Sequence, residues 1–245
     1  MAKFGWDGEL RKERIVFSLP VFCIAGNPWL APGFAFLMDR YWPRADLTIL
    51  HWDDLILKDQ PMTKAKYHCL GEDQGVDKWS DSLIPFFQDA PDYFAVMLED
   101  YWLNRPVNNH VIEILAAHQE IWGFAKMDLY KGVMSLPHTL DCRFNGFNLL
   151  ELPQTERYRT SLHLNIWRKD YFLKLLRPGL SPWQFELNNP SVINDGELIL
   201  GTDLCPVSYV NVVRGGMNDR KAMKELIQDD LDEMKRRRIC VPAWG

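Results

Sequence analysis

The sequence lacks an apolar run of about eighteen residues, the length that crosses a membrane, and it lacks paired cysteines at zinc-binding spacing. Its 5 cysteines, Cys23, Cys69, Cys142, Cys205 and Cys240, are scattered and odd in number. We therefore expect reduced thiols and no disulfide framework. No signal-peptide pattern precedes the first apolar segment. These absences predict a cytoplasmic protein that does not span a membrane.

Glycine-rich phosphate loops are also missing. Neither GxGxxG nor GxxxxGK[ST] occurs, so a dinucleotide fingerprint and a P-loop are both unsupported. The net charge of -5 argues against a dedicated nucleic-acid-binding protein, although it does not exclude a local basic patch. The chain of 245 residues is long enough for one large hydrophobic core, and we expect a single domain over 1–245.

Short apolar runs alternate with amphipathic segments along the chain. Strands are expected at 15–24, 47–51, 67–70, 94–98, 122–129, 198–200 and 207–213. Helices are expected at 29–41, 77–88, 108–120, 167–176 and 219–237, with another beginning at Ser181-Pro182. The alternation predicts an α/β/α sandwich with a mostly parallel central sheet. Residues 131–157 are rich in Pro, Gly and Asn and predict a loop or hairpin excursion, and 219–245 predict a C-terminal helix and tail.

The most informative stretch is 94–102, Phe-Ala-Val-Met-Leu-Glu-Asp-Tyr-Trp. Five apolar residues suit a strand that is covered on both faces, as in a parallel sheet. Ligands of open α/β sheets bind at the carboxyl ends of such strands, which is where Glu99 and Asp100 follow. Carboxylate oxygens are the ligands that Mg²⁺ and Mn²⁺ prefer. The pattern therefore predicts a cation site, and its alternative is a buried strand that ends in solvated acids.

Several segments together resemble a known family. They are WLAPGFAFLMDRYWP, HWDD, WSDSLIPFF, VMLEDYWL and SLHLNIWRKDYFLKLLRPGLSPWQFE, and they extend over about residues 14–216. Their order and spacing resemble the small glycosyltransferases of GT-A fold that are encoded in bacterial surface-polysaccharide clusters and in phage genomes. EDYWL and IWRKDY followed by SPWQFE are the most specific pieces.

The resemblance implies a Rossmann-like fold, a nucleotide-diphosphate sugar as donor, with a UDP-sugar favoured, and a divalent metal, Mn or Mg. The metal would be held by Asp100 and Glu99. The family's acidic motif is Asp-x-Asp or Asp-Asp, and Glu99 departs from it. Asp100 is therefore the principal expected ligand, and Glu99 is either a second ligand or a hydrogen-bond partner of the donor ribose.

Further donor contacts follow from the same resemblance. Ser18, Leu19 and Pro20 would border the base and ribose, and Asp53, beside Trp52, would accept a hydrogen bond from the base or ribose. Arg214 ends a late strand and would close over the diphosphate. A solvated loop acid at Asp53 and a plain turn at Arg214 are the alternatives.

Glu186 is the expected catalytic base, because inverting enzymes of this fold place a carboxylate at the start of a helix that faces the acceptor. Trp183 would form an apolar wall for the acceptor, and His163 and Asn165 on a neighbouring strand would contact it. The alternative for Glu186 is an N-terminal helix acid that accepts backbone N–H bonds. Leu187 stands where the family often has Asp, which weakens the inverting assignment.

Two acceptors and one inactive alternative remain open. The favoured acceptor is a saccharide. The other is a hydroxymethylated pyrimidine in phage DNA, for which the basic run Lys235-Arg236-Arg237-Arg238 would contact phosphates. The same run is also typical of a solvated helix end. The third alternative is a binding module that keeps the fold without catalysis.

Overall fold

The computed structural model describes residues 19–53, 63–130, 139–144, 147–156, 158–187, 194–214 and 217–241. Ser18 lies outside this part of the chain. Within it, no helix is both long and apolar enough to cross a membrane. Cys23, Cys69 and Cys240 are free thiols, as the sequence predicts.

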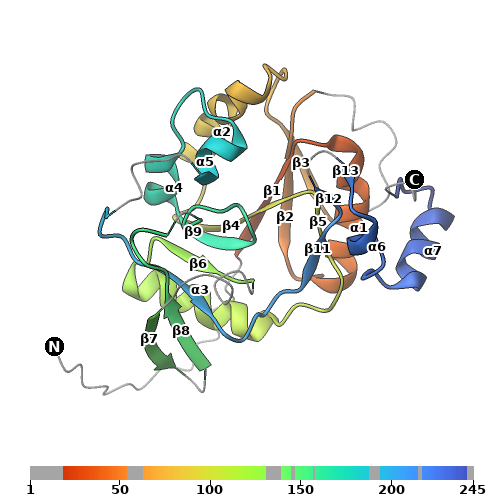
Figure 1. Cartoon of the computed structure of the whole chain (residues 1–245). Coiled ribbons are helices and arrows are strands. Elements are labelled where there is room, and N and C mark those ends of the chain that lie inside the picture. Colours follow the sequence, from red (N-terminus) through yellow and green to blue (C-terminus); the bar gives the residue numbers. More distant parts are fainter. Residues whose placement is uncertain are drawn as a thin grey trace.

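A nine-stranded sheet forms the centre of the described structure, in the order β3-β2-β1-β4-β9-β6-β10-β8-β7 (Figure 1). Its strands are β1 (Pro20–Ala25), β2 (Asp46–His51), β3 (Lys66–Cys69), β4 (Tyr93–Leu98), β6 (Lys126–Asp128), β7 (Thr139–Phe144), β8 (Phe147–Glu151), β9 (Asn165–Arg168) and β10 (Ile199–Thr202). Strands β3, β2, β1 and β4 are parallel neighbours, and β6 is parallel to β10. Strand β9 lies antiparallel between β4 and β6. The mostly parallel α/β sheet is confirmed.

Smaller strands complete the carboxyl edge of the sheet. Strand β5 (Tyr101–Leu103) follows β4 directly and pairs antiparallel with β11 (Tyr209–Asn211). Strands β12 (Val213–Arg214) and β13 (Met217–Asn218) form a short antiparallel pair next in the chain. The late segment 209–218 therefore returns to the end of β4, where the acidic pair lies.

Helices cover both faces of the sheet. They are α1 (Ala31–Tyr41), α2 (Trp79–Gln88), α3 (Asn109–Trp122), α4 (Lys169–Leu175), α5 (Pro182–Leu187), α6 (Arg220–Met223) and α7 (Gln228–Arg236), with 3-10 turns η1 (Pro28–Leu30) and η3 (Val76–Lys78). Side chains of β1 alternate between the two layers, as strand geometry requires. Val21 and Cys23 pack in the cluster that contains α1 and α3, whereas Phe22 packs in the cluster that contains α2, α4 and α5.

Local signals place two helix starts correctly. The Asn108 side chain accepts a hydrogen bond from the Val111 N–H at 3.3 Å, which caps α3 as predicted. At α5, Ser181 Oγ accepts from the Gln184 N–H at 3.3 Å, and Gln184 Oε1 accepts from the Ser181 N–H at 2.8 Å. This reciprocal capping box fixes the first turn of the helix that carries Glu186.

Two helix expectations need correction, and one open alternative is decided. The helix expected at 29–41 begins with η1, because Pro28 and Pro32 restrict the first turn, and α1 itself starts at Ala31. Of the loop and the hairpin expected within 131–157, the structure shows the hairpin, formed by β7 and β8, and it extends the main sheet through β10. The expected helix 219–237 is divided into α6 and α7.

A close approach between α1 and β5 holds the acidic loop in place. A Cβ atom on Gly33 would lie 2.4 Å from Cζ2 of Trp102, so only glycine lets the fully buried indole fit against the helix. The Trp102 indole N–H donates to the Glu99 carbonyl oxygen at 3.1 Å. Packing against α1 therefore determines the course of the backbone at Glu99 and Asp100.

Candidate functional site

Glu99 joins the carboxyl ends of two neighbouring strands. Ile24 of β1 is paired with Leu98 of β4, so Asn27 and Glu99 come to the same edge of the sheet. Glu99 Oε1 accepts hydrogen bonds from the Asn27 backbone N–H at 2.5 Å and from Asn27 Nδ2 at 2.9 Å. The side chain is 3% exposed, and burial raises its pKa while the Asn27 donors act in the opposite direction. Glu99 is therefore a structural link between β4 and β1.

Asp100 is an acid with one side-chain oxygen that lacks a partner in the described part of the chain, although its side chain also forms a hydrogen bond with the Asn211 side chain. Its Oδ1 atom is buried and has no hydrogen-bond partner among the described residues. Burial, followed by the negative charges of Glu99 and Glu186, raises the pKa of Asp100 from 3.8 to about 8, while hydrogen bonds from the backbone and from the Asn211 side chain act in the opposite direction. Its backbone carbonyl accepts from the Val212 N–H at 2.8 Å, which ties it to the late segment. A buried acid in such surroundings is suited to receive a cation.

The residues present fit a divalent cation only in part. In the described ranges, no group of three His, Cys, Asp or Glu side chains could hold a metal ion by itself. Asp100 offers a free oxygen, whereas Glu99 Oε1 already accepts two hydrogen bonds from Asn27. Mg²⁺ commonly binds proteins through one or two carboxylates and takes its other ligands from substrate phosphates and water. The donor set at Asp100 fits that mode of binding.

We expect Asp100→Asn to stabilise the protein when no divalent cation is present. Because the pKa of Asp100 is raised to about 8, the folded protein keeps this group protonated while the unfolded chain ionises it above about pH 4, so the free energy of unfolding falls between about pH 4 and pH 8. Asparagine has no charge to bury, so the free energy of unfolding should rise by about 1–3 kcal/mol at pH 8 and by almost nothing at pH 4. Urea unfolding in EDTA at both pH values measures the difference. Exposed Asp77→Asn is the control, and a variant less stable than wild type at pH 8 would contradict the expectation.

Glu186 lies close enough to Asp100 for their charges to interact. Glu186 Oε1 accepts the Leu162 N–H at 2.5 Å, and burial raises the pKa of Glu186. The Glu186 charge in turn raises the pKa values of Asp100 and Tyr101. The structure thus brings the predicted base and the predicted metal ligand to one site, although 86 positions separate them in the sequence.

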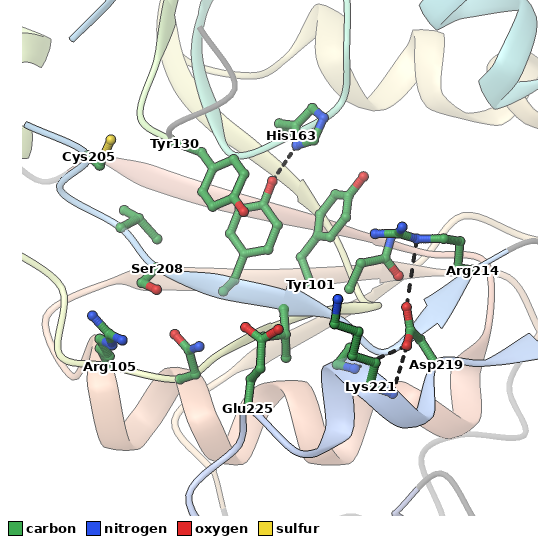
Figure 2. A pocket seen from close by; sticks show the side chains of 16 residues that line it. Tyr101, Arg105, Tyr130, His163, Cys205, Ser208, Arg214, Asp219, Lys221 and Glu225 are labelled. Carbon is green, nitrogen blue, oxygen red and sulfur yellow. Dashed lines mark hydrogen bonds and ion pairs between the residues drawn. The ribbon is translucent and has the colours of Figure 1, made fainter. Parts of the chain in front are cut away.

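A cavity of about 530 Å³ is lined by Tyr101, the residue that follows Asp100, whereas Asp100 and Glu186 themselves are not among its lining residues (Figure 2). Its lining residues are Tyr101, Asn104, Arg105, Tyr130, His163, Cys205, Val207, Ser208, Tyr209, Val210, Asn211, Arg214, Asp219, Lys221, Ala222 and Glu225. Aromatic side chains gather on one side of it, and charged side chains of the segment 214–225 lie on the other (Figure 2). The volume and the mixed lining are typical of a small-molecule site.

The aromatic side of the cavity is a packed cluster around His163. The imidazole is nearly parallel to the Tyr101 ring, at 7° and 5.6 Å between centroids, and to the Tyr130 ring, at 8° and 5.7 Å. His163 Nδ1 forms a hydrogen bond with the Tyr209 hydroxyl (Figure 2). Burial, followed by the nearby positive charge of Lys126, lowers the pKa of His163 to about 4. His163 is therefore neutral near pH 7 and belongs to the cavity wall.

The other residues that the sequence predicts to bind the acceptor lie outside the cavity lining. Asn165 is fully buried in β9, and its Nδ2 donates to the carbonyl oxygens of Ser161 at 2.8 Å and His163 at 2.6 Å. Trp183 is 62% exposed and does not line the cavity described above. The structure therefore brings His163 to the cavity but gives Asn165 a structural environment.

The residues that the sequence predicts to bind the sugar donor are divided between two ends of the sheet. Leu19 and Pro20 lie at the amino end of β1, opposite the end that meets Glu99, because the strand begins at Pro20. That placement does not support their contact with a donor. Asp53 follows β2 at the carboxyl edge, with a positive φ of 61°. Its Oδ1 accepts the Asp73 N–H at 3.4 Å.

Arg214 lies at the rim of the cavity. Its side chain is 78% exposed, and its Nε is 3.8 Å from Asp219 Oδ2. An exposed ion pair of this length contributes little to stability. The position of Arg214 agrees with a side chain that could reach a bound anion.

Sequence reasoning missed the tyrosines of the cavity and two charged residues of β6. Tyr101, Tyr130 and Tyr209 come from three separate segments, and nothing local marks them as neighbours. Lys126 and Asp128 are both buried, with one residue between them in an otherwise apolar segment. Two opposite charges at a spacing of two on a short apolar strand are a signal that could have found this pair.

Comparisons with known proteins leave the family unassigned. No family model matches the sequence, and no curated protein matches it. Among solved structures, the chain is similar to apo UDP-glucose pyrophosphorylase, with a TM-score of 0.45 and 9% sequence identity. The similarity covers 89% of this chain and 99% of that one. A likeness of this extent assigns no activity to the protein.

Proposed function

We propose that the protein transfers a sugar from a nucleotide-diphosphate sugar, with a UDP-sugar as first choice, to an acceptor hydroxyl, with inversion at the anomeric carbon. The single observation that carries the proposal is that Asp100, whose buried Oδ1 has no hydrogen-bond partner among the described residues, lies close enough to Glu186 for the two charges to interact. An electrostatic site for a leaving group and a base for a nucleophile are the two elements that this reaction needs.

Asp100 supports the donor side of the reaction. It would hold a Mn²⁺ or Mg²⁺ ion, which when bound neutralises the charge of the diphosphate leaving group. Glu99 keeps the loop in place through Asn27 and is assigned no more than an orienting role. Arg214 at the rim supplies an exposed positive charge for the same phosphates.

Glu186 supports the acceptor side. It accepts the proton of the acceptor hydroxyl while the new bond to the anomeric carbon forms and the bond to the diphosphate oxygen breaks. A carboxylate with a raised pKa is a stronger base than an exposed one. The Leu162 N–H bond at 2.5 Å fixes its orientation. These features agree with general-base catalysis at this position.

A saccharide is the acceptor that the cavity favours. A volume of about 530 Å³ suits a small saccharide, and the tyrosine side offers apolar ring surface together with hydroxyl groups. The basic run at the end of α7 gives the DNA alternative no support. Arg236 and Arg237 form ion pairs with Glu233 at 2.5 and 2.6 Å, as at a solvated helix end.

A thermal-shift screen of nucleotide sugars tests the proposal. We expect a UDP-sugar with Mn²⁺ to raise the melting temperature, because a ligand at 100 times its Kd adds about 2.7 kcal/mol to stability. The shift should shrink in EDTA and in Asp100→Asn, and it should persist in the exposed control Asp77→Asn. If no nucleotide sugar stabilises the wild-type protein with or without metal, the proposal is wrong.

A further inference from the structure

A lysine is buried behind the proposed base. Lys126 of β6 is 0% exposed, and its ammonium donates to the Arg159 carbonyl oxygen at 2.9 Å and to Ser161 Oγ at 3.3 Å. It also lies 5.1 Å from the centroid of the Trp167 ring. All of these partners are neutral. Among the described residues, Lys126 forms no ion pair within 4.0 Å.

Stability alone does not explain a charge in this place. Removing an ammonium from water costs several kcal/mol, and neutral hydrogen-bond partners restore only part of it. Burial accordingly lowers the pKa of Lys126 to about 8, so the group still carries its charge at pH 7. A methionine would fill a similar volume without this cost. The two acids whose negative charges favour the Lys126 ammonium are Asp128 on the same strand and Glu186.

A short segment connects Lys126 to Glu186. We call residues 159–162 the bracket. Lys126 binds its Arg159 and Ser161, and the next residue, Leu162, donates its N–H to Glu186 Oε1 at 2.5 Å. The hydroxyl of Thr160 in the same bracket lies within hydrogen-bond distance of the carbonyl oxygens of Phe185 and Glu186, at 3.1 and 3.0 Å. The bracket thus fixes the end of α5 relative to β6.

The Lys126 ammonium affects the ionisation of Glu186, which has charged groups on more than one side. Asp100 and Tyr101 face Glu186 from the β4–β5 side, and Lys126 faces it from β6. Lys126 itself also faces Asp128, Arg159 and His163. Burial favours a protonated Glu186, whereas the Leu162 N–H and the positive charge of Lys126 favour its ionised form.

We propose that Lys126 is a positioning residue for Glu186, which holds the carboxylate in place through the bracket and favours its ionised form. The importance of this effect for sugar transfer rests on the proposed function. The effect on the ionisation of the Glu186 carboxyl group does not rest on the proposed function, because this effect is measured without substrate.

Two substitutions separate the charge from the hydrogen bonds. Lys126→Gln keeps a donor and loses the charge, and Lys126→Met loses both at a similar length. The Glu186 side-chain carboxyl is followed by carbon-13 NMR as the pH changes, with its signal assigned from the spectrum of Glu186→Gln. We expect the titration midpoint to rise by about one pH unit in both variants, which is a tenfold change in the ionisation constant. Ser161→Ala removes one hydrogen bond and leaves the charge, so its midpoint should stay at the wild-type value.

An unchanged midpoint in a folded Lys126 variant overturns the inference. Lys126→Met supplies this measurement if Lys126→Gln does not fold, because it leaves no polar side chain at the buried position. Where wild type transfers sugar, the acid limb of its pH–rate profile should move by the same amount in the variants. A shifted midpoint in a protein that turns over no nucleotide sugar would support the link between Lys126 and Glu186 while contradicting the proposed function.

Discussion

Asp100→Ala is expected to lower sugar transfer by about 10³-fold or more, with the fold intact. Removal of one preorganised electrostatic group from an active site commonly costs about 10²–10³-fold, and loss of a metal ligand removes the cation as well. Asp100 Oδ1 has no hydrogen-bond partner among the described residues, so its truncation breaks no side-chain contact through that atom. The release of UDP from a UDP-sugar in saturating Mn²⁺ measures the effect, and circular dichroism checks the fold.

The control for Asp100→Ala is Asp77→Ala, which removes an exposed carboxylate before α2. Its transfer rate should equal that of wild type. A rate for Asp100→Ala within about threefold of wild type would remove this residue from the donor site. Since Glu99 Oε1 is bound to Asn27, we do not expect Glu99 to replace it.

Glu186→Gln is expected to lower kcat by about 10²–10⁴-fold while donor binding is retained, because general-base assistance contributes a factor of this size. Glutamine keeps the acceptor oxygen for the Leu162 N–H and loses only the ability to take a proton. The wild-type rate should fall as the pH drops through the raised pKa of Glu186, since only the ionised form accepts the proton. The variant should lack this acid limb.

Thermal shift with the UDP-sugar and steady-state kinetics together test Glu186→Gln. Exposed Glu120→Gln on α3 is the matched control and should retain both donor binding and kcat. Comparable turnover in Glu186→Gln and wild type would exclude Glu186 as the base. Retained donor binding without turnover in wild type itself would favour the non-catalytic binding module.

Local sequence determined much of the framework. The apolar run before Glu99 predicted a buried strand, and β4 is that strand, with the acids at its carboxyl end. Asn108 and Ser181 predicted helix starts, and both side chains cap their helices. These predictions succeed because capping and strand burial depend on residues that are only a few positions apart.

Only the tertiary structure decided which residues meet. The antiparallel entry of β9 between β4 and β6 is a pairing between distant segments, and no local pattern encodes it. The same holds for the tyrosine cluster of the cavity and for the bracket that joins Lys126 to Glu186. Leu19 and Pro20 fell at the wrong end of β1 because strand boundaries and register depend on packing across the sheet. The sequence by itself therefore identified the acids and their strand end, whereas the Asp100 oxygen that has no partner in the described structure, the charge interaction of Asp100 with Glu186 and the buried lysine behind Glu186 arise from burial and long-range contacts.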